Sequence, residues 1–123
     1  MNQVNAAPFT TKGFDFVMFV AEDMQRARNF YESLFDIKPG EFDSEYFVEY
    51  DLPDGNTFAL GHNPDAPHTP IGGIMFHVED ADSAAERVVS LGGKLAGNFS
   101  GPKCKTAWCT DTEGNSFGLH QRT

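Results

Sequence analysis

Two histidines close segments that alternate like β-strands. His77 ends the segment 73–77 and His120 ends the segment 116–120. Imidazole titrates near neutral pH, so each side chain could accept a proton in catalysis or hydrogen-bond a bound molecule. A single histidine is also commonly a hydrogen-bonded structural residue, and that alternative stays open for both. We take His77 and His120 as the candidate catalytic residues.

Two further histidines lie in a proline-rich segment. His62 and His68 flank Asp65 between residues 62 and 70, where three prolines also occur. Imidazole and carboxylate groups could capture a metal ion there. A solvated loop is the more common role of such a segment, and we expect a linker.

The two cysteines do not indicate a disulfide framework. Cys104 and Cys109 have an odd spacing, so on one strand they would point to opposite faces, where a bridge cannot close. The neighbours Lys103 and Lys105 could lower a thiol pKa. Spectator thiols are the simpler interpretation. The sequence contains no Ser-His-Asp order, phosphate-binding loop or zinc-type cysteine spacing.

The elements that must position these groups occur in two copies. Asp80 ends a segment that repeats the one ending at Asp23, 57 positions earlier. Gly114-Asn115 likewise repeats Gly55-Asn56 at an offset of 59. Similar order and offset indicate two related supersecondary units that share one core.

Each copy predicts a strand, a helix and then further strands. Asp23 and Asp80 are suited to cap helices. Apolar residues at helical spacing follow each of them, to Phe35 in the first copy and to Val88 in the second. Pro39-Gly40 and Gly92-Gly93 end these helical regions. Strands are predicted at 14–20, 45–52, 57–61, 73–78, 94–99, 106–110 and 116–120, with a weaker one near 37–42.

The predicted fold class is therefore α+β, with two tandem βαβββ modules in a single domain. Module one spans residues 13–61, the linker 62–70 and module two 71–121, and residues 1–12 form a flexible N-terminal arm.

Composition excludes some partners. The chain has 123 residues, a net charge of −9 and a pI near 4.6, so nucleic-acid phosphates would be repelled. No apolar run approaches the ~20 residues of a membrane span, and no signal-peptide pattern opens the chain. We expect a cytoplasmic protein with neither nucleic-acid nor membrane partners.

This module order resembles the vicinal oxygen chelate superfamily, which includes glyoxalase I, bleomycin-resistance proteins and extradiol dioxygenases. The closing Phe117-Gly118-Leu119-x-Gln121 is similar to an uncharacterised branch related to lactoylglutathione lyase. The resemblance implies a curved mixed sheet around a central cavity, with the helices on its outer face. Its most specific residues are Asp23-(x)6-Phe30-Tyr31, Leu91-Gly92-Gly93 and the stretch Asp111–Gln121.

The resemblance also places four metal ligands, two in each module. The matching positions here are Phe16, Ala59, Gly73 and Gly118, whose side chains offer no nitrogen, oxygen or sulfur. A divalent metal needs about three or four such donors. We therefore expect neither the family metal nor another cofactor.

The same positions would instead line an apolar pocket. Small residues at three of them leave room, and strand alternation adds neighbours on the same face. The alternative is that the pocket collapses into core packing. Trp108 is either a ligand platform or a core residue, because its face is undetermined. The expected ligand-binding residues are Phe16, Met18, Ala59, Gly73, Met75, Trp108 and Gly118.

Three functions fit these features. The first is a metal-free protein that binds a small apolar, aromatic or cationic molecule, similar to bleomycin-resistance proteins, and forms a homodimer with shared sites. The second is a metal-independent lyase or isomerase that uses His77 or His120. The third is a structural or regulatory module with a degenerate pocket.

Overall fold

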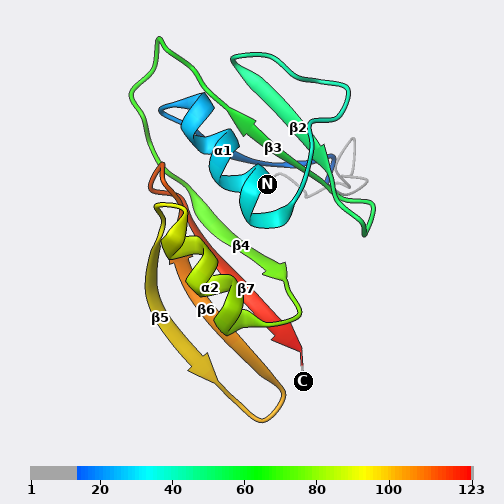
Figure 1. Ribbon diagram of the computed structural model, residues 1–123. Helices are drawn as coiled ribbons and strands as arrows, with labels where there is room; N and C mark the ends of the chain where they lie inside the picture. Colours follow the sequence, from blue (N-terminus) through cyan, green and yellow to red (C-terminus); the bar gives the residue numbers. More distant parts are fainter. Residues whose placement is uncertain (1–13, 123) are drawn as a thin grey trace, which may run out of the picture.

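The computed structural model describes residues 14–122, so the predicted N-terminal arm at 1–12 lies outside the described residues. The order of elements repeats (Figure 1). The first unit contains β1 (Val17–Val20), α1 (Met24–Phe35), β2 (Phe47–Asp51) and β3 (Thr57–Gly61). The second contains β4 (Gly72–His77), α2 (Ala81–Ser90), β5 (Lys94–Ser100), β6 (Cys104–Thr110) and β7 (Ser116–Arg122).

The strand registers confirm the internal repeat. In module one, β1 runs parallel to β3 and Met18 pairs with Ala59. In module two, β4 runs parallel to β7 and Met75 pairs with Gly118. These pairs are related by the offsets of 57 and 59 seen in the sequence. The predicted α+β class and paired modules are therefore correct.

The strands form two mixed sheets rather than one continuous sheet. Their orders are β1-β3-β2 and β4-β7-β6-β5. The weak strand expected near 37–42 does not form, and only an isolated bridge joins Asp43 to Val48. Pro39 has no backbone N–H to donate, and Pro and Gly both disfavour a regular strand. Gly40 N–H still donates to the Glu49 carbonyl at 2.8 Å, so this segment remains beside β2.

Both helices begin at the predicted aspartates. Asp23 accepts from the Arg26 N–H and Asp80 from the Ser83 N–H, each at 3.0 Å. Helix α1 ends at Asp36, which adopts the left-handed region at φ 53°, where a short polar side chain is tolerated. Each helix lies across one face of its own sheet (Figure 1).

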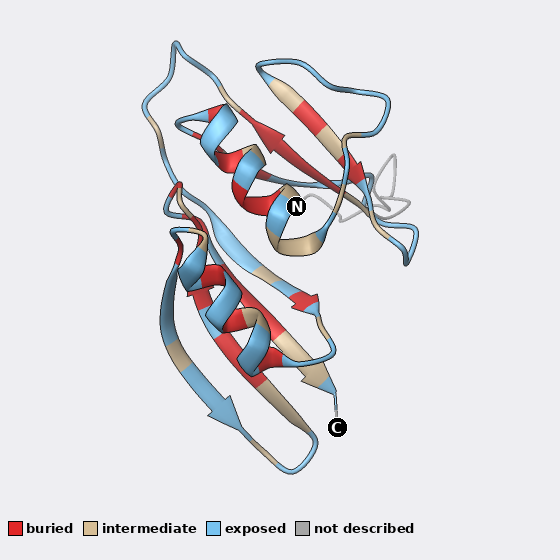
Figure 2. Cartoon of the chain, viewed as in Figure 1, coloured by how far each residue is buried: buried red, intermediate tan, exposed pale blue. Residues whose placement is uncertain are grey.

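Buried residues lie on helices and strands of both modules (Figure 2). The aromatic side chains among them build one core between the helices and the sheets. Phe76 of β4 packs against Phe19, Phe35 and Phe58 of module one, with ring centroids 4.7 to 6.5 Å apart. Phe117 packs similarly against Tyr31 at 6.1 Å. Because aromatic rings of each module are buried against rings of the other, neither module forms a complete hydrophobic core by itself.

Candidate functional site

The two sheet faces that point away from the helices carry most of the predicted site residues. Alternation places Phe19 and Leu119 in the core, so their strand neighbours point to the opposite side. We call these surfaces the module-one face and the module-two face. The first comprises Met18, Val20, Phe47, Glu49, Ala59 and Gly61, and the second Met75, His77, Thr106, Trp108, Gly118 and His120.

Several large side chains on these two sides of the sheets are exposed in a single chain. The relative accessible surface is 37 to 47% for four of them, namely Phe16, Met18, Met75 and Trp108. The side chains expected to line one central cavity therefore lie on two exposed faces. This answers the question left open for Trp108, which lies on the open face and outside the core.

Methionines occupy the space that small residues were expected to leave. A Cβ atom added at Gly118 would collide with Met75 Sδ and lie 3.3 Å from Trp108 Cζ3. Ala59 is fully buried. The expected room is therefore filled at these two positions, whereas no atom lies within 4 Å of a Cβ built at Gly73. Methionine is flexible, so the filled space can be reshaped.

His77 and His120 are direct neighbours on the module-two face. They are register partners on the parallel strands β4 and β7, and Thr106 of β6 is the next residue across. Within residues 14–122, no hydrogen bond joins either imidazole to another side chain or to the backbone. These two imidazoles thus lie one row along the sheet from Met75 and Trp108.

The module-one face has no such pair. The positions equivalent to His77 and His120 hold Val20 and Gly61. Met18 leans over Gly61, where an added Cβ would lie 2.6 Å from Met18 Sδ. The thioether is therefore common to both modules, whereas the imidazoles belong to module two.

A groove of about 800 Å³ runs between the modules beside these faces. Phe16 enters it from module one, and Met75 and His77 enter it from module two. Its rim also carries acidic side chains, namely Asp15, Asp36, Asp51 and Asp54. Three of the predicted site residues from different modules thus share one hollow.

The linker histidines have structural contacts. His62 Nδ1 is 2.8 Å from the Ala21 carbonyl oxygen, and His68 Nε2 is 2.6 Å from that of Glu113. Each ring nitrogen donates to its carbonyl. These bonds fasten the linker to the end of β1 and to the last hairpin turn.

The linker also borders a second hollow, of about 540 Å³, near the start of α1. The rings of Tyr46 and His62 lie nearly parallel there, with centroids 6.4 Å apart.

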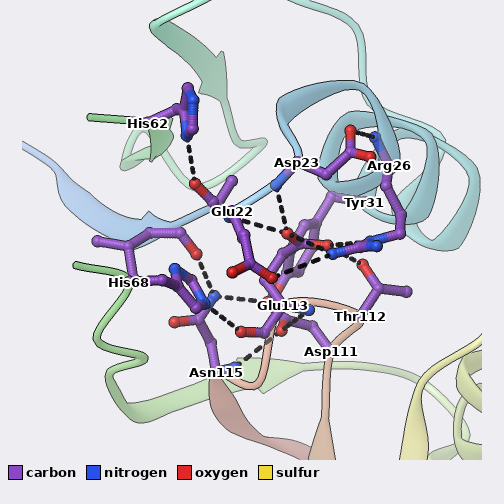
Figure 3. Close-up of polar contacts among 12 residues, drawn as sticks. Glu22, Asp23, Arg26, Tyr31, His62, His68, Asp111, Thr112, Glu113 and Asn115 are labelled. Carbon is purple, nitrogen blue, oxygen red and sulfur yellow. Dashed lines mark hydrogen bonds and ion pairs between the residues drawn. The ribbon is translucent and has the colours of Figure 1, made fainter. Parts of the chain in front are cut away.

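A buried carboxylate joins the last hairpin to the start of α1 (Figure 3). Glu113 Oε1 accepts from the N–H groups of Glu22 and Asp23 at 2.9 and 2.8 Å. Its Oε2 accepts from Arg26 Nε at 2.7 Å and from the Thr112 hydroxyl at 2.8 Å. Burial alone would raise the pKa of Glu113, but these hydrogen bonds and the charge of Arg26 lower it below the ordinary value.

Asp111 and Asn115 extend the same network (Figure 3). Asp111 accepts a 2.7 Å bond from the Tyr31 hydroxyl, and burial raises the pKa of Tyr31 well above its ordinary value, helped by that carboxylate. Asn115 Nδ2 donates to Asp111 and to the Val20 carbonyl, while its Oδ1 accepts from the Ile71 N–H at 2.9 Å.

Sequence reasoning identified this segment as a turn and missed its role between the modules. The available signal was the acidic residue Glu113 before Gly114-Asn115, because helix N-termini favour carboxylates. Which helix it would reach depends on the tertiary fold.

The two thiols lie on opposite faces of β6, with Cys104 on the side of Thr106 and Trp108 and Cys109 on the core side. Both are free, and Cys109 is buried in the core, where burial raises its pKa. Lys105 Nζ pairs with Asp82 at 3.1 Å. Among the described residues, no group of three or more His, Cys, Asp and Glu side chains is arranged to hold a metal. In the same part of the chain, no helix has the length and apolar character needed to cross a bilayer.

Comparison with known proteins extends across nearly the whole chain. Residues 13–119 match the Glyoxalase/Bleomycin resistance protein/Dioxygenase superfamily. No curated protein matches significantly. Solved structures share the fold at low identity. A glyoxalase/bleomycin resistance protein from Albidiferax ferrireducens T118 is 20% identical, with TM-score 0.72 over 89% of this chain and 98% of that one.

Two further structures have more specific descriptions. A fosfomycin resistance protein from Mesorhizobium loti is 22% identical, with TM-score 0.68 over 93% of this chain and 95% of its own. A lactoylglutathione lyase from Agrobacterium tumefaciens is 17% identical, with TM-score 0.69 over 90% and 94%. At these identities the likeness establishes the fold alone.

Proposed function

Because the chain belongs to the glyoxalase/bleomycin resistance protein/dioxygenase superfamily, we propose that it binds a small apolar or aromatic molecule on its open sheet faces without the superfamily metal. The observation that carries this proposal is the module-two face. There an exposed indole and a flexible thioether lie beside two unengaged imidazoles. Apolar walls with a few polar groups are typical of small-molecule sites.

The ligand positions support a metal-free site. Phe16, Ala59, Gly73 and Gly118 stand where the superfamily pattern places donors, and none has a donor atom. Affinity would come mainly from apolar area, at about 25 cal/mol per Å² removed from water before the costs of binding. One histidine hydrogen bond would fix orientation for about 1 kcal/mol net.

A second copy of the chain is the partner we propose for these faces. Exposed apolar side chains gather there, and such patches commonly mark interfaces. The module-one face carries Glu49, whereas the module-two face carries His77 and His120. A two-fold dimer that apposes unlike faces would bring these groups together and enclose the pocket. Light scattering tests this. A single 13.6 kDa species at high concentration would refute it.

Binding can be tested with N-phenyl-1-naphthylamine, a neutral aromatic probe whose fluorescence rises in apolar surroundings. Gly118→Leu should abolish binding, because its side chain takes the space shared with Met75 and Trp108. His77→Phe should weaken binding less than about tenfold, since it removes one hydrogen bond. Unaltered thermal unfolding serves as the control for folding. Equal affinity in Gly118→Leu and the unmodified protein would contradict the proposal.

The alternative is a metal-independent lyase or isomerase. The adjacency of His77 and His120 favours it, because one neutral imidazole could remove a proton from carbon while the other, in its protonated form, donates its own proton to a neighbouring atom. Lactoylglutathione is a sensible first substrate, since a lyase of that name shares the fold. Turnover lost in His77→Phe with probe affinity intact would identify an enzyme. Absence of turnover in the unmodified protein would leave binding as the function.

A further inference from the structure

We propose that the module-two face binds a soft monovalent metal ion, Cu(I), through Met75 Sδ and the imidazoles of His77 and His120. The indole of Trp108 would lie beside the ion. This inference goes beyond small-molecule binding and does not depend on it.

The three donors share one side of two neighbouring strands. Met75 and His77 are two positions apart on β4, with the core residue Phe76 between them pointing the other way. His120 is the register partner of His77 on β7. Neighbouring strands lie about 4.7–4.9 Å apart, and the next residue on the same face of one strand is about 7 Å away. One ion above the boundary of β4 and β7 is within reach of all three.

The donors are free to turn toward an ion. Neither imidazole has a hydrogen-bond partner between residues 14 and 122. The Met75 side chain is 41% exposed and lies over Gly118, which leaves it three rotatable bonds. Coordination therefore breaks no existing polar contact.

The kind of donor determines the kind of ion. Thioethers are soft ligands that select Cu(I), and imidazole is also a good copper ligand. Mg²⁺ and Ca²⁺ require oxygen donors, and structural Zn²⁺ takes four nitrogen, sulfur or oxygen ligands. Within the described chain no set of three His, Cys, Asp or Glu side chains meets that need. Together, one thioether and two imidazoles form a set of three donors that is best suited to a soft metal ion.

Trp108 adds a second attraction. Its ring edge lies 3.3 Å from the Cβ position of Gly118, beside the Met75 side chain. The π-electrons of an indole attract a cation that lies over the ring. A net charge of −9 also favours a positive ion over an anion.

The internal repeat supplies a matched control. Met18 occupies the position of Met75 in module one, but Val20 and Gly61 replace the two imidazoles. If a thioether on an open face were sufficient, both modules would bind. The proposal requires that only module two does.

The test is a titration with Ag(I), a redox-inert substitute for Cu(I), in buffer free of chloride and thiols. Trp108 is the only tryptophan, so quenching of its fluorescence reports this face directly. All variants carry Cys104→Ser, because that partly exposed thiol is on the same strand and face as Trp108 and would compete for silver, whereas Cys109 is buried in the core.

We expect quenching that saturates at one equivalent of Ag(I). Met75→Leu, His77→Gln and His120→Gln should each weaken binding by about tenfold or more, whereas Met18→Leu should change it less than about twofold. Zn(II) at the same concentrations should not quench. Competition with bathocuproine disulfonate under reducing, anaerobic conditions then gives the Cu(I) affinity.

Unchanged affinity in Met75→Leu, or equal losses in Met18→Leu and Met75→Leu, would overturn the inference. So would loss of all Ag(I) binding on introducing Cys104→Ser. Binding of N-phenyl-1-naphthylamine is measured separately without metal, so failure of the metal site and failure of the small-molecule site are distinguishable.

Discussion

The two Gly-Asn hairpin turns have the same backbone and different surroundings. Gly55 and Gly114 adopt φ values of 91° and 90°, and each turn closes with equivalent backbone hydrogen bonds. In module one, Asn56 is exposed, and among the described residues its side chain bonds only Asp54 of the same turn. In module two, Asn115 is fully buried and bonds Val20, Ile71 and Asp111. The two turns therefore have the same backbone shape. The hydrogen-bond partners of their asparagine side chains differ because the fold places the turns in different surroundings.

The largest difference between the turns should come from their asparagines. Asn115→Ala leaves the Val20 carbonyl and the Ile71 N–H without this partner in a partly buried place, and should cost about 3 kcal/mol of unfolding free energy. Asn56→Ala removes hydrogen bonds that water can replace, so its change in unfolding free energy should be close to experimental error. Urea denaturation of both variants measures the contrast. Equal losses would show that the environments are energetically alike.

Removing the charge of Glu113 should have the next largest effect. Glu113→Gln loses the charged pair with Arg26 in a buried position and should cost about 2 kcal/mol at pH 7. Asp54→Asn provides the exposed control in module one.

The effect of Glu113 should also depend on pH. Its folded-state pKa lies below the ordinary 4.5. Its contribution is therefore fully present above pH 4.5 and is lost as pH falls through the lower, folded-state value. The unmodified protein should lose stability in that acid range more steeply than Glu113→Gln. Parallel curves of unfolding free energy against pH would contradict this assignment.

The turn glycines should show a smaller difference. Both require positive φ, so Gly55→Ala should cost about 1 kcal/mol. Gly114→Ala should cost about 2 kcal/mol, because the added Cβ would also lie 3.0 Å from Pro70 Cγ. No atom lies within 4 Å of the Cβ position at Gly55. Thermal unfolding of the two variants shows which substitution lowers Tm more. A larger fall in Tm for Gly55→Ala than for Gly114→Ala would contradict this prediction.

The helix caps should show no difference between the modules. Asp23 and Asp80 accept the same bond at the same 3.0 Å length. Asp23→Ala and Asp80→Ala should therefore lower Tm by similar amounts. A much larger fall for Asp23→Ala would indicate that the contacts of Glu113 at that helix start depend on the cap.

Local signals predicted the parts of the fold that depend on local chemistry. The capping aspartates placed both helices, and the repeat offsets correctly related the pair of Met18 with Ala59 to that of Met75 with Gly118. The strand near 37–42 failed because Pro39-Gly40 prevents regular pairing, although the segment still lies beside β2. The fold places this segment next to β2, but the low strand propensity of Pro and Gly keeps it from forming a regular strand.

The candidate site was less predictable for a different reason. Alternation put Met75, His77 and His120 on one face, as the structure shows. Alternation cannot reveal that Met75 fills the space above Gly118, because that depends on a side-chain torsion. Nor could it reveal the reach of Glu113 to α1, which requires the arrangement of one module against the other.

The bond from Glu113 to the Glu22 N–H spans 91 positions of sequence, which matters while the chain is being synthesised. Helix α1 is synthesised early, whereas the carboxylate that bonds its first turn follows 91 positions after Glu22, and Phe117, which packs against Tyr31, follows that carboxylate. Domains tend to complete folding as units, and long-range contacts slow that step. Part of the aromatic surface of module one therefore stays uncovered until the β6–β7 hairpin has been synthesised. In a growing chain, this is the interval in which chaperones would be most needed.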